Sequence, residues 1–260
     1  MTTQTIELRK EQVATYHLAR SAAYRLLSQA TVYPTGEVVA ALSDEDLSQA
    51  QAAAAVLGAP FSERLGVFER ELHAASPEQL QDQHRRIFSH ILSLDCPPCE
   101  TVYTASEIFQ ETDHLSDIAG FFRAFGMELA EKERPDHISI ELEFMHLVTC
   151  KEAVAQLRHG PEKARLCRGV QRKFMEDHLG RWGQQFARQL ERQAPAGYFR
   201  AVARLLDAFL AAEVSYMRAK PEVLRVNSDW RTKLDEEGCS TTDGCPLVES
   251  GEDDGNLIQL

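Results

Sequence analysis

The sequence has no long apolar run and no feature that would direct it to a membrane or out of the cell. No stretch of about 18 or more apolar residues occurs, so no membrane span is expected. Residues 1–12 are polar and lack the apolar segment of a secretory signal peptide. We therefore expect a cytoplasmic protein, in which the six cysteines are mostly reduced.

The chain also lacks an excess of basic residues, since it carries 28 Lys and Arg against 40 Asp and Glu. The formal charge of −12 argues against a nucleic-acid ligand, because a phosphate backbone needs a basic surface. This charge would suit a basic partner, although solubility alone is a more general reason for it. No Gly-rich phosphate loop is present, and no Ser or Cys nucleophile lies in a recognisable catalytic context.

Glycine (14 residues) and proline (10 residues) are scarce, and most of them lie where helices would begin or end. No run with period 2 appears, whereas apolar residues recur at helical spacing. The sequence therefore predicts an all-α protein with a single helical bundle domain, residues 12–220. Residues 1–11 are expected to be a flexible N-terminus, and residues 221–260 a disordered, mobile acidic tail. The expected helices are 14–31, 43–57, 60–75, 77–92, 106–125, 138–157, 162–179, 182–193 and 198–219.

The helix expected over 138–157 has apolar residues on more than one face, which is typical of a buried central helix. Pro135 is interpreted as its opening residue, because the N–H that proline lacks would have no partner in the first turn. The polar residues gathered at this helix head are Glu133, Arg134, Asp136, His137 and Glu141. They could form a general acid–base group, but their spacing alone favours a cluster that caps the helix and ties it to its neighbours.

The loop 93–104 interrupts the helical pattern, and its two adjacent prolines predict a stiff, extended wall of a site. Cys96 and Cys99 flank these prolines with the spacing of a metal or redox pair. Zinc would need a second pair, and the only candidates, Cys239 and Cys245, are loosely spaced and lie in the tail. We interpret the loop cysteines first as packed or half-exposed thiols.

Two Glu–His pairs have the three-residue spacing of a di-iron carboxylate motif: Glu111 with His114, and Glu143 with His146. Two such pairs, with one Glu from each of two further helices, would form a di-metal site in a four-helix bundle. Good candidates for the further carboxylates are missing, and helices rich in Glu produce such pairs by chance. A helical di-metal carboxylate enzyme remains the alternative function.

Residues 115–126, Leu-Ser-Asp-Ile-Ala-Gly-Phe-Phe-Arg-Ala-Phe-Gly, and 133–145, Glu-Arg-Pro-Asp-His-Ile-Ser-Ile-Glu-Leu-Glu-Phe-Met, resemble segments of a known family. They are similar to the TorD/DmsD/NarJ family of redox-enzyme maturation chaperones. The stretch 97–103, Pro-Pro-Cys-Glu-Thr-Val-Tyr, resembles the Pro-Pro loop of that family, and 86–88 resembles its short Leu-Phe motif. The features occur in the family's order, and the resemblance covers about residues 12–219.

The resemblance implies an all-helical cytoplasmic chaperone that is not an enzyme and has no cofactor of its own. Such proteins bind the N-terminal leader of the catalytic subunit of a molybdopterin oxidoreductase, often a twin-arginine signal, and hold the subunit for cofactor insertion before export. The segments 100–103, Glu-Thr-Val-Tyr, and 119–126, Ala-Gly-Phe-Phe-Arg-Ala-Phe-Gly, are most similar to chaperones of the ethylbenzene, dimethylsulfide, selenate and chlorate enzyme group. Carried over by position, the leader-binding residues would be Asp136, His137, Glu133, Arg134, Glu141, Phe88, Pro98, Cys99, Glu100 and Tyr103.

The chemistry of these residues suits such a leader. Carboxylates such as those of Asp136, Glu133 or Glu100 could accept bidentate hydrogen bonds from arginine. An aromatic and apolar groove could take the apolar segment that follows the two arginines. Cys99 is a departure, because relatives often carry an aromatic residue there, and the shape of the groove is expected to differ.

Overall fold

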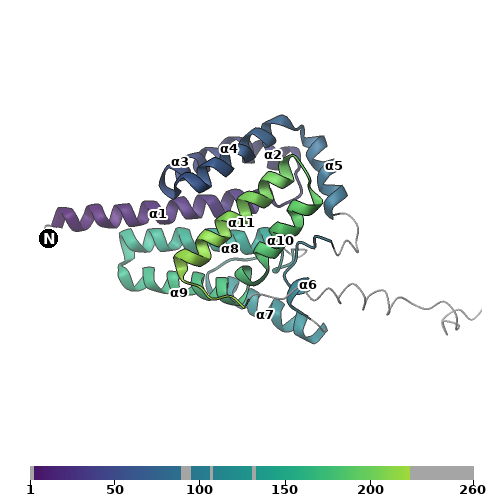
Figure 1. The fold of residues 1–260 in the computed structure, drawn as a ribbon. Coiled ribbons are helices and arrows are strands. Elements are labelled where there is room, and N and C mark those ends of the chain that lie inside the picture. The colour runs from purple at the N-terminus through teal and green to yellow at the C-terminus, as the bar shows by residue number, and fades with distance from the viewer. Residues whose placement is uncertain (1–2, 89–94, 106–107, 131–132, 223–260) are drawn as a thin grey trace, which may run out of the picture. The chain divides into compact units, whose positions relative to one another are not determined.

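The computed structural model describes residues 3–88, 95–105, 108–130 and 133–222 of the 260-residue chain (Figure 1). Within these ranges every regular element is a helix and no strand occurs, so the all-α prediction is confirmed. No helix in these ranges is both long enough and apolar enough to cross a membrane. The predicted acidic tail lies outside the described residues from 223 onward, and so do its two cysteines.

The helices follow one another in the order that the sequence predicts. They are α1 (Thr3–Ala30), α2 (Gly36–Ala41), α3 (Leu47–Leu57), α4 (Ala59–Ala74), α5 (Pro77–Phe88), α6 (Thr101–Thr104), α7 (Ile108–Ala124), α8 (Ile138–Val154), α9 (Pro161–Asp177), α10 (Leu179–Gln193) and α11 (Tyr198–Met217). Two π-helical turns, η1 (Leu42–Asp46) and η2 (Ala155–His159), extend α3 at its start and α8 at its end.

The first helix is longer than predicted, because it begins at Thr3 and not at Ala14. Residues expected to form a flexible N-terminus are therefore helical from Thr3 onward. This segment has no clear apolar stripe, but Glu, Leu, Arg, Lys and Gln are good helix formers. The short helices α2 and α6 were also absent from the prediction, and α6 lies inside the loop that was expected to be extended.

The head of α8 differs from the prediction in a way that matters for the site. The helix begins at Ile138, and His137 is its N-cap, with an extended backbone and a side chain that accepts the N–H of Ser139. Pro135 is therefore not the opening residue. Asp136 stays outside the helix because its carbonyl accepts a hydrogen bond from the backbone of Glu100. The hypothesis that this polar cluster caps the helix is confirmed for His137.

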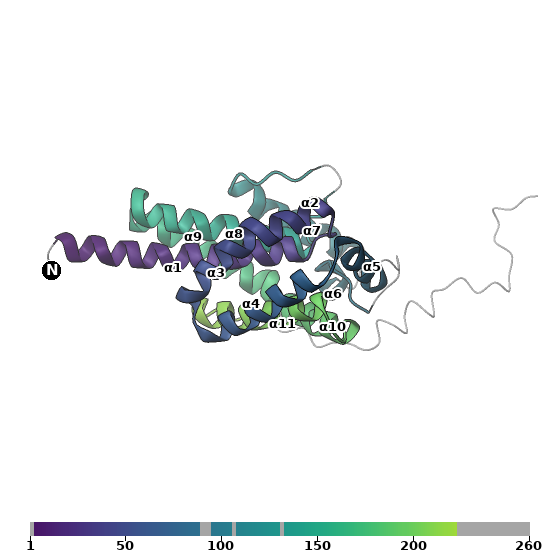
Figure 2. The same ribbon diagram turned by 90° about the horizontal axis from the view of Figure 1, so that it is seen from above.

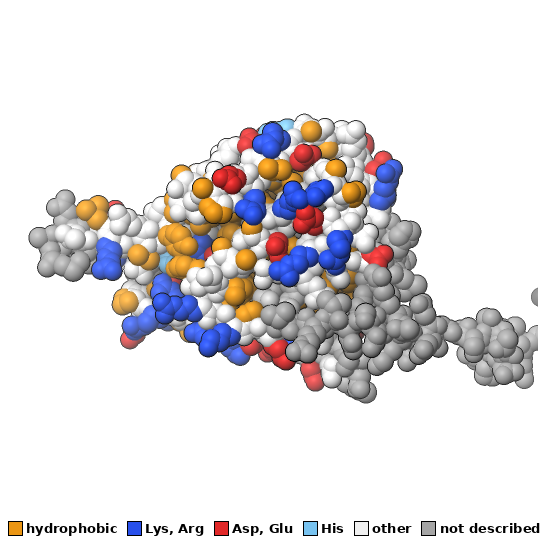
Figure 3. Space-filling view, viewed as in Figure 1, with side chains coloured by type: hydrophobic (Ala, Val, Ile, Leu, Met, Phe, Trp, Pro, Cys, Tyr) orange, Lys and Arg blue, Asp and Glu red, His pale blue; other side chains and the backbone are white. Residues whose placement is uncertain are grey.

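The centre of the fold is α8, as its apolar circumference predicts. It packs along α1 on one side and α9 on another, while α10 and α11 pack together and α11 contacts α4 (Figures 1 and 2). Phe122, Phe144 and Phe174 lie in contact at the centre of the core. On the face shown in Figure 3, acidic and basic side chains are interspersed, so the net negative charge is not concentrated there.

Candidate functional site

The Pro-Pro loop is attached to the head of α8 through backbone hydrogen bonds. The N–H of Glu100 donates to the carbonyl of Asp136 at 2.9 Å, and the N–H of Ile138 donates to the carbonyl of Pro98 at 2.8 Å. These bonds flank a single antiparallel bridge. Two segments that are far apart in the sequence are thereby held as one unit.

The Asp136 carboxylate is the centre of this unit, and it is fully buried. Thr101 donates to it from its backbone N–H at 3.2 Å and from its hydroxyl at 2.7 Å. Arg134 donates from Nε to Oδ1 at 2.9 Å and from Nη2 to Oδ2 at 3.1 Å. Burial alone would raise the pKa of the Asp136 carboxyl, but the hydrogen bonds from Arg134 and Thr101 outweigh burial and lower it. The side chain is therefore a carboxylate at neutral pH.

Arg134 also connects the carboxylate to α7. Its Nη2 reaches the Glu111 carboxylate at 2.8 Å and the Thr101 hydroxyl at 3.0 Å. In contrast to Asp136, the Arg134 side chain is 48% exposed. We call the group formed by Thr101, Glu111, Arg134 and Asp136 the Asp136 clasp.

A second set of polar groups lies buried behind the clasp. The Glu141 carboxyl accepts from Trp182 Nε1 at 3.2 Å, and its other oxygen has no hydrogen-bond partner among the described residues. Burial, and then the charge of Glu100, raise the pKa of Glu141 well above its usual range. His178 lies between Glu100 and Asp117, at 3.2 Å from each carboxylate. The side chains of Glu100 and Glu141 are thus fully buried, and Glu141 faces the protein interior.

A cavity of about 520 Å³ lies next to His178. Several of its carboxylates already have basic partners, such as Glu176 with Arg172 and Asp177 with Lys173. These carboxylates are therefore neutralised from within the chain. The lining residues are Glu100, His114, Asp117, Glu176, Asp177, His178, Arg181, Lys220 and Glu222.

An aromatic surface on α5 adjoins the head of α8. The ring centroids of His84 and Phe88 are 4.6 Å apart, and those of Phe88 and Phe199 are 5.9 Å apart. Burial, and then the charge of His137, lower the pKa of His84 to about 4. Burial also lowers the pKa of His137. Both imidazole rings are therefore neutral at pH 7, so the aromatic surface carries no charge from them. His84 was not predicted as a site residue, because only the fold brings it near His137.

Three of the predicted site residues in the loop segment are half-buried: Pro98, Cys99 and Tyr103. The Tyr103 hydroxyl donates to Gln189 at 2.6 Å, and its ring lies 5.2 Å from that of Trp182. Both loop cysteines are free thiols, and burial raises the pKa of Cys96 and of Cys99 to about 12. Neither is a thiolate at neutral pH, so the geometry favours packed thiols over a reactive pair.

The structure therefore brings nine of the ten predicted site residues to the head of α8 and the loop that pairs with it, and Phe88 adjoins them through His84. Glu133 is exposed, and its carboxylate accepts the N–H of Ala130 at 3.1 Å. The sequence did not predict Thr101 or Glu111 as members of this site, because their roles depend on contacts between distant segments.

The four residues of the proposed di-metal site all have other partners. Glu111 binds Arg134, and Glu143 binds Arg25 at 2.9 Å. The two histidines contact hydroxyl groups: His114 that of Thr104, and His146 that of Ser21. In the part of the chain that the structure describes, no three His, Cys, Asp or Glu side chains are grouped as metal ligands. The di-metal hypothesis is therefore wrong for these residues.

A family model described as "Nitrate reductase delta subunit" matches residues 43–188, which include the loop, the clasp and most of the core. The chain belongs to this family. The match contains both segments on which the resemblance to TorD/DmsD/NarJ maturation chaperones depends, and it confirms that assignment. Members of the family are maturation chaperones and not catalysts, so the enzyme alternative is excluded at this level too.

Two curated relatives are similar to the chain. The perchlorate reductase assembly chaperone protein of Dechloromonas aromatica is 28% identical over 210 residues, which is 77% of this chain and 90% of that protein. The selenate reductase assembly chaperone protein of Thauera selenatis is 35% identical over 98 residues, 36% of this chain and 50% of that protein. A crystal structure of a putative redox enzyme maturation protein from Archaeoglobus fulgidus aligns with 60% of this chain and 93% of its own, at 22% identity and a TM-score of 0.34.

Proposed function

We propose that this protein is a cytoplasmic chaperone that binds the N-terminal, twin-arginine leader of the catalytic subunit of a molybdopterin oxidoreductase of the dimethyl sulfoxide reductase family. It holds this subunit while the molybdenum cofactor is inserted and releases it for export afterwards. The leader binds at the head of α8, between the Pro-Pro loop and the aromatic surface on α5.

The observation that carries this proposal is the Asp136 clasp. A carboxylate at this place binds a guanidinium group through two nearly parallel hydrogen bonds, which is the geometry that recognises arginine. The Arg134 side chain is half exposed, so the buried Asp136 carboxylate that it contacts lies close to the surface. The site is thus built to hold an arginine side chain.

The apolar segment of a leader would contact the neighbouring aromatic surface. Phe88 and the neutral rings of His84 and His137 can bury apolar side chains without desolvating a charge. A helical or extended leader can pack its apolar residues against such a surface. The formal charge of −12 would increase the rate of encounter with a basic leader.

The names of the relatives suggest the class of client. Assembly chaperones of perchlorate and selenate reductases are similar to this chain. We infer that the client here reduces an oxyanion or a related small substrate. This inference agrees with the similarity of segments 100–103 and 119–126 to chaperones of the selenate and chlorate enzyme group.

Calorimetric titration of the purified protein with leader peptides from oxyanion reductases would test the proposal. We expect a dissociation constant of about 1 μM or tighter, and weaker binding when both leader arginines are replaced by lysine. Equally tight binding of the arginine and the lysine peptides would show that the protein recognises the apolar segment alone. An absence of binding to all leaders would contradict the proposal.

A further inference from the structure

The guanidinium that is hydrogen-bonded to the Asp136 carboxylate belongs to Arg134 of the same chain. We propose that Arg134 is an internal substitute for a leader arginine, and that a leader binds by exchanging its own guanidinium for that of Arg134. This inference rests on the proposed function and adds to it a competitor within the site. In this account Arg134 sets how tightly the site binds a leader, because every leader has to displace it.

The hydrogen-bond capacity of Asp136 makes an exchange necessary. Its two oxygens accept four hydrogen bonds, two from Thr101 and two from Arg134. An ionised carboxylate offers about four such positions. A leader arginine can therefore bind both oxygens only if Arg134 leaves, while Thr101 remains in place and keeps the carboxylate oriented.

Arg134 is placed so that it can leave. Its side chain is 48% exposed, and its Nη2 already contacts the Glu111 carboxylate, which is 39% exposed, at 2.8 Å. After displacement, the guanidinium can remain paired with Glu111 at the rim of the site. Arg134 then keeps its existing pair with Glu111. The leader guanidinium takes the place of Arg134 at Asp136, so no buried charge is left uncompensated.

The exchange also explains why lysine would be a poor substitute in the leader. Arg134 presents two donors, Nε and Nη2, in the fixed geometry of a planar guanidinium. The ammonium group of lysine is a point charge without this fork. A lysine leader would therefore lose the competition with Arg134, whereas an arginine leader competes on equal terms.

The first test is the variant Arg134→Gln. Glutamine cannot occupy both oxygens of Asp136 through two parallel donors, so the competitor is removed. We expect this variant to bind a twin-arginine leader peptide at least about tenfold more tightly than the wild type, and to bind the lysine peptide less tightly than the arginine peptide. Glu111→Gln should weaken binding of the arginine peptide, because the displaced Arg134 loses its second partner.

A matched control is available on α1. Arg25 is also a partly exposed arginine, with 36% exposure, and it donates to both oxygens of Glu143 at 2.9 and 3.0 Å. Arg25 binds Glu143 through Nη1 alone and also contacts Asp46 at 3.4 Å. Arg25→Gln removes these partly exposed ion pairs away from the site. We expect it to leave the affinity for both peptides unchanged. A gain in affinity in both variants would show a general effect of charge and would overturn the proposal.

A second measurement is independent of the peptides. Millimolar argininamide should raise the midpoint of thermal unfolding of Arg134→Gln, but not that of the wild type or of Arg25→Gln, because only the first has an open guanidinium position. Lysinamide should have no such effect. If argininamide stabilises Arg134→Gln but no leader peptide binds the wild type or any variant, Asp136 can still accept a second guanidinium. The proposal that the protein binds a leader would then be wrong. If argininamide does not stabilise this variant and the arginine peptide binds it no more tightly than the wild type, the inference is wrong.

Discussion

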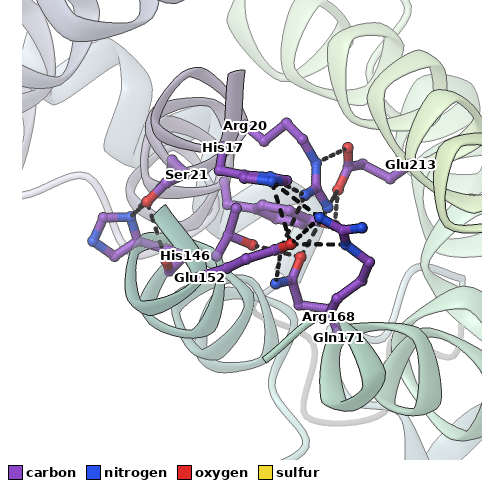
Figure 4. A network of polar contacts seen from close by, with 10 residues as sticks. His17, Arg20, Ser21, His146, Glu152, Arg168, Gln171 and Glu213 are labelled. Carbon is purple, nitrogen blue, oxygen red and sulfur yellow. Dashed lines mark hydrogen bonds and ion pairs between the residues drawn. The ribbon is translucent and has the colours of Figure 1, made fainter. Parts of the chain in front are cut away.

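Two arginine–carboxylate groups in this protein have nearly the same chemistry and different surroundings. In the network between α1, α8, α9 and α11, Arg20 donates to both oxygens of Glu213, at 2.7 and 2.6 Å (Figure 4). In the Asp136 clasp, Arg134 donates to both oxygens of Asp136. The Arg20 side chain is 1% exposed and that of Arg134 is 48% exposed. The two pairs share their geometry and differ in the exposure of the arginine side chain. If a ligand can replace Arg134 and not Arg20, this difference in exposure is the reason.

The buried network satisfies its groups completely. Tyr24 and Arg20 both donate to Glu213, and Arg20 also donates to Gln171 at 2.9 Å. Gln171 in turn donates to Glu152 at 2.8 Å. Because burial of each charge is costly, such a network is stable only when all its members are present. It ties the first helix to the last and to the centre of the fold, far from the head of α8.

The largest expected effect is the loss of stability in Arg20→Ala. This change leaves the Glu213 carboxylate buried without its arginine, whereas Glu152 keeps Arg168 at 2.7 Å. We expect the free energy of unfolding to fall by about 3–5 kcal/mol. Urea unfolding measures this loss. Leader affinity of the folded fraction should not change. A stable Arg20→Ala protein with altered leader affinity would contradict the distinction between the two groups.

A pH dependence follows from His17 in the same network. Arg20 Nη1 lies 3.2 Å from His17 Nδ1, and His17 Nε2 lies 3.2 Å from Glu152, so the ring is a neutral tautomer that accepts from arginine and donates to the carboxylate. Burial, and then the charges of Arg20 and Arg168, lower the pKa of His17 to about 4. Between about pH 4 and 6.5 the unfolded chain binds more protons, so stability falls as the pH is lowered through this window.

The variant His17→Gln tests this dependence. It should reduce the loss of stability between pH 6.5 and 4 by about 2–3 kcal/mol, as measured by urea unfolding at several pH values. The pKa of His84 is also lowered to about 4, so part of the dependence of stability on pH should remain in this variant. Asp136 affects stability at lower pH, because its pKa is lowered. The stability that it contributes is lost only below the ordinary pKa of about 3.9. An unchanged slope in His17→Gln would show that the network does not hold this ring neutral.

A smaller effect on stability is expected at the clasp. Asp136→Asn keeps the shape of the side chain but removes the charge, and Arg134 is free to turn to Glu111. We expect a loss of about 1–3 kcal/mol in the free energy of unfolding, together with a loss of most of the affinity for the twin-arginine leader. Thermal unfolding and calorimetry measure the two quantities. Unchanged affinity in this variant would remove Asp136 from the leader site.

The smallest effect is expected for Arg25→Gln, which breaks the partly exposed pair with Glu143 and a longer contact with Asp46 at 3.4 Å. Such pairs contribute about 0–1 kcal/mol and are screened by salt. Urea unfolding at low and high salt should show a difference between variant and wild type that is small and shrinks as salt is added. A loss as large as that of Arg20→Ala would mean that exposure does not decide the strength of these pairs.

Much of the fold could be predicted from helical periodicity, because α3 to α5 and α7 to α11 are amphipathic or buried and are punctuated by Gly and Pro. The resemblance of 133–145 to a family located the head of α8 before its geometry was known. The start of α8 was misplaced, because Asp136 uses its carbonyl for the loop and cannot join the helix. The pair of Arg20 and Glu213 had no sequence signal, since the two residues are 193 positions apart and only the fold brings them together.

Hydrogen–deuterium exchange with and without a twin-arginine leader peptide tests the central claim most directly. If the leader binds at the head of α8, protection should increase in residues 95–104 and 133–141, and the helices around Arg20 should be unchanged. Protection confined to α1, α9 and α11, with none at the clasp, would show that the leader binds elsewhere and would contradict the account.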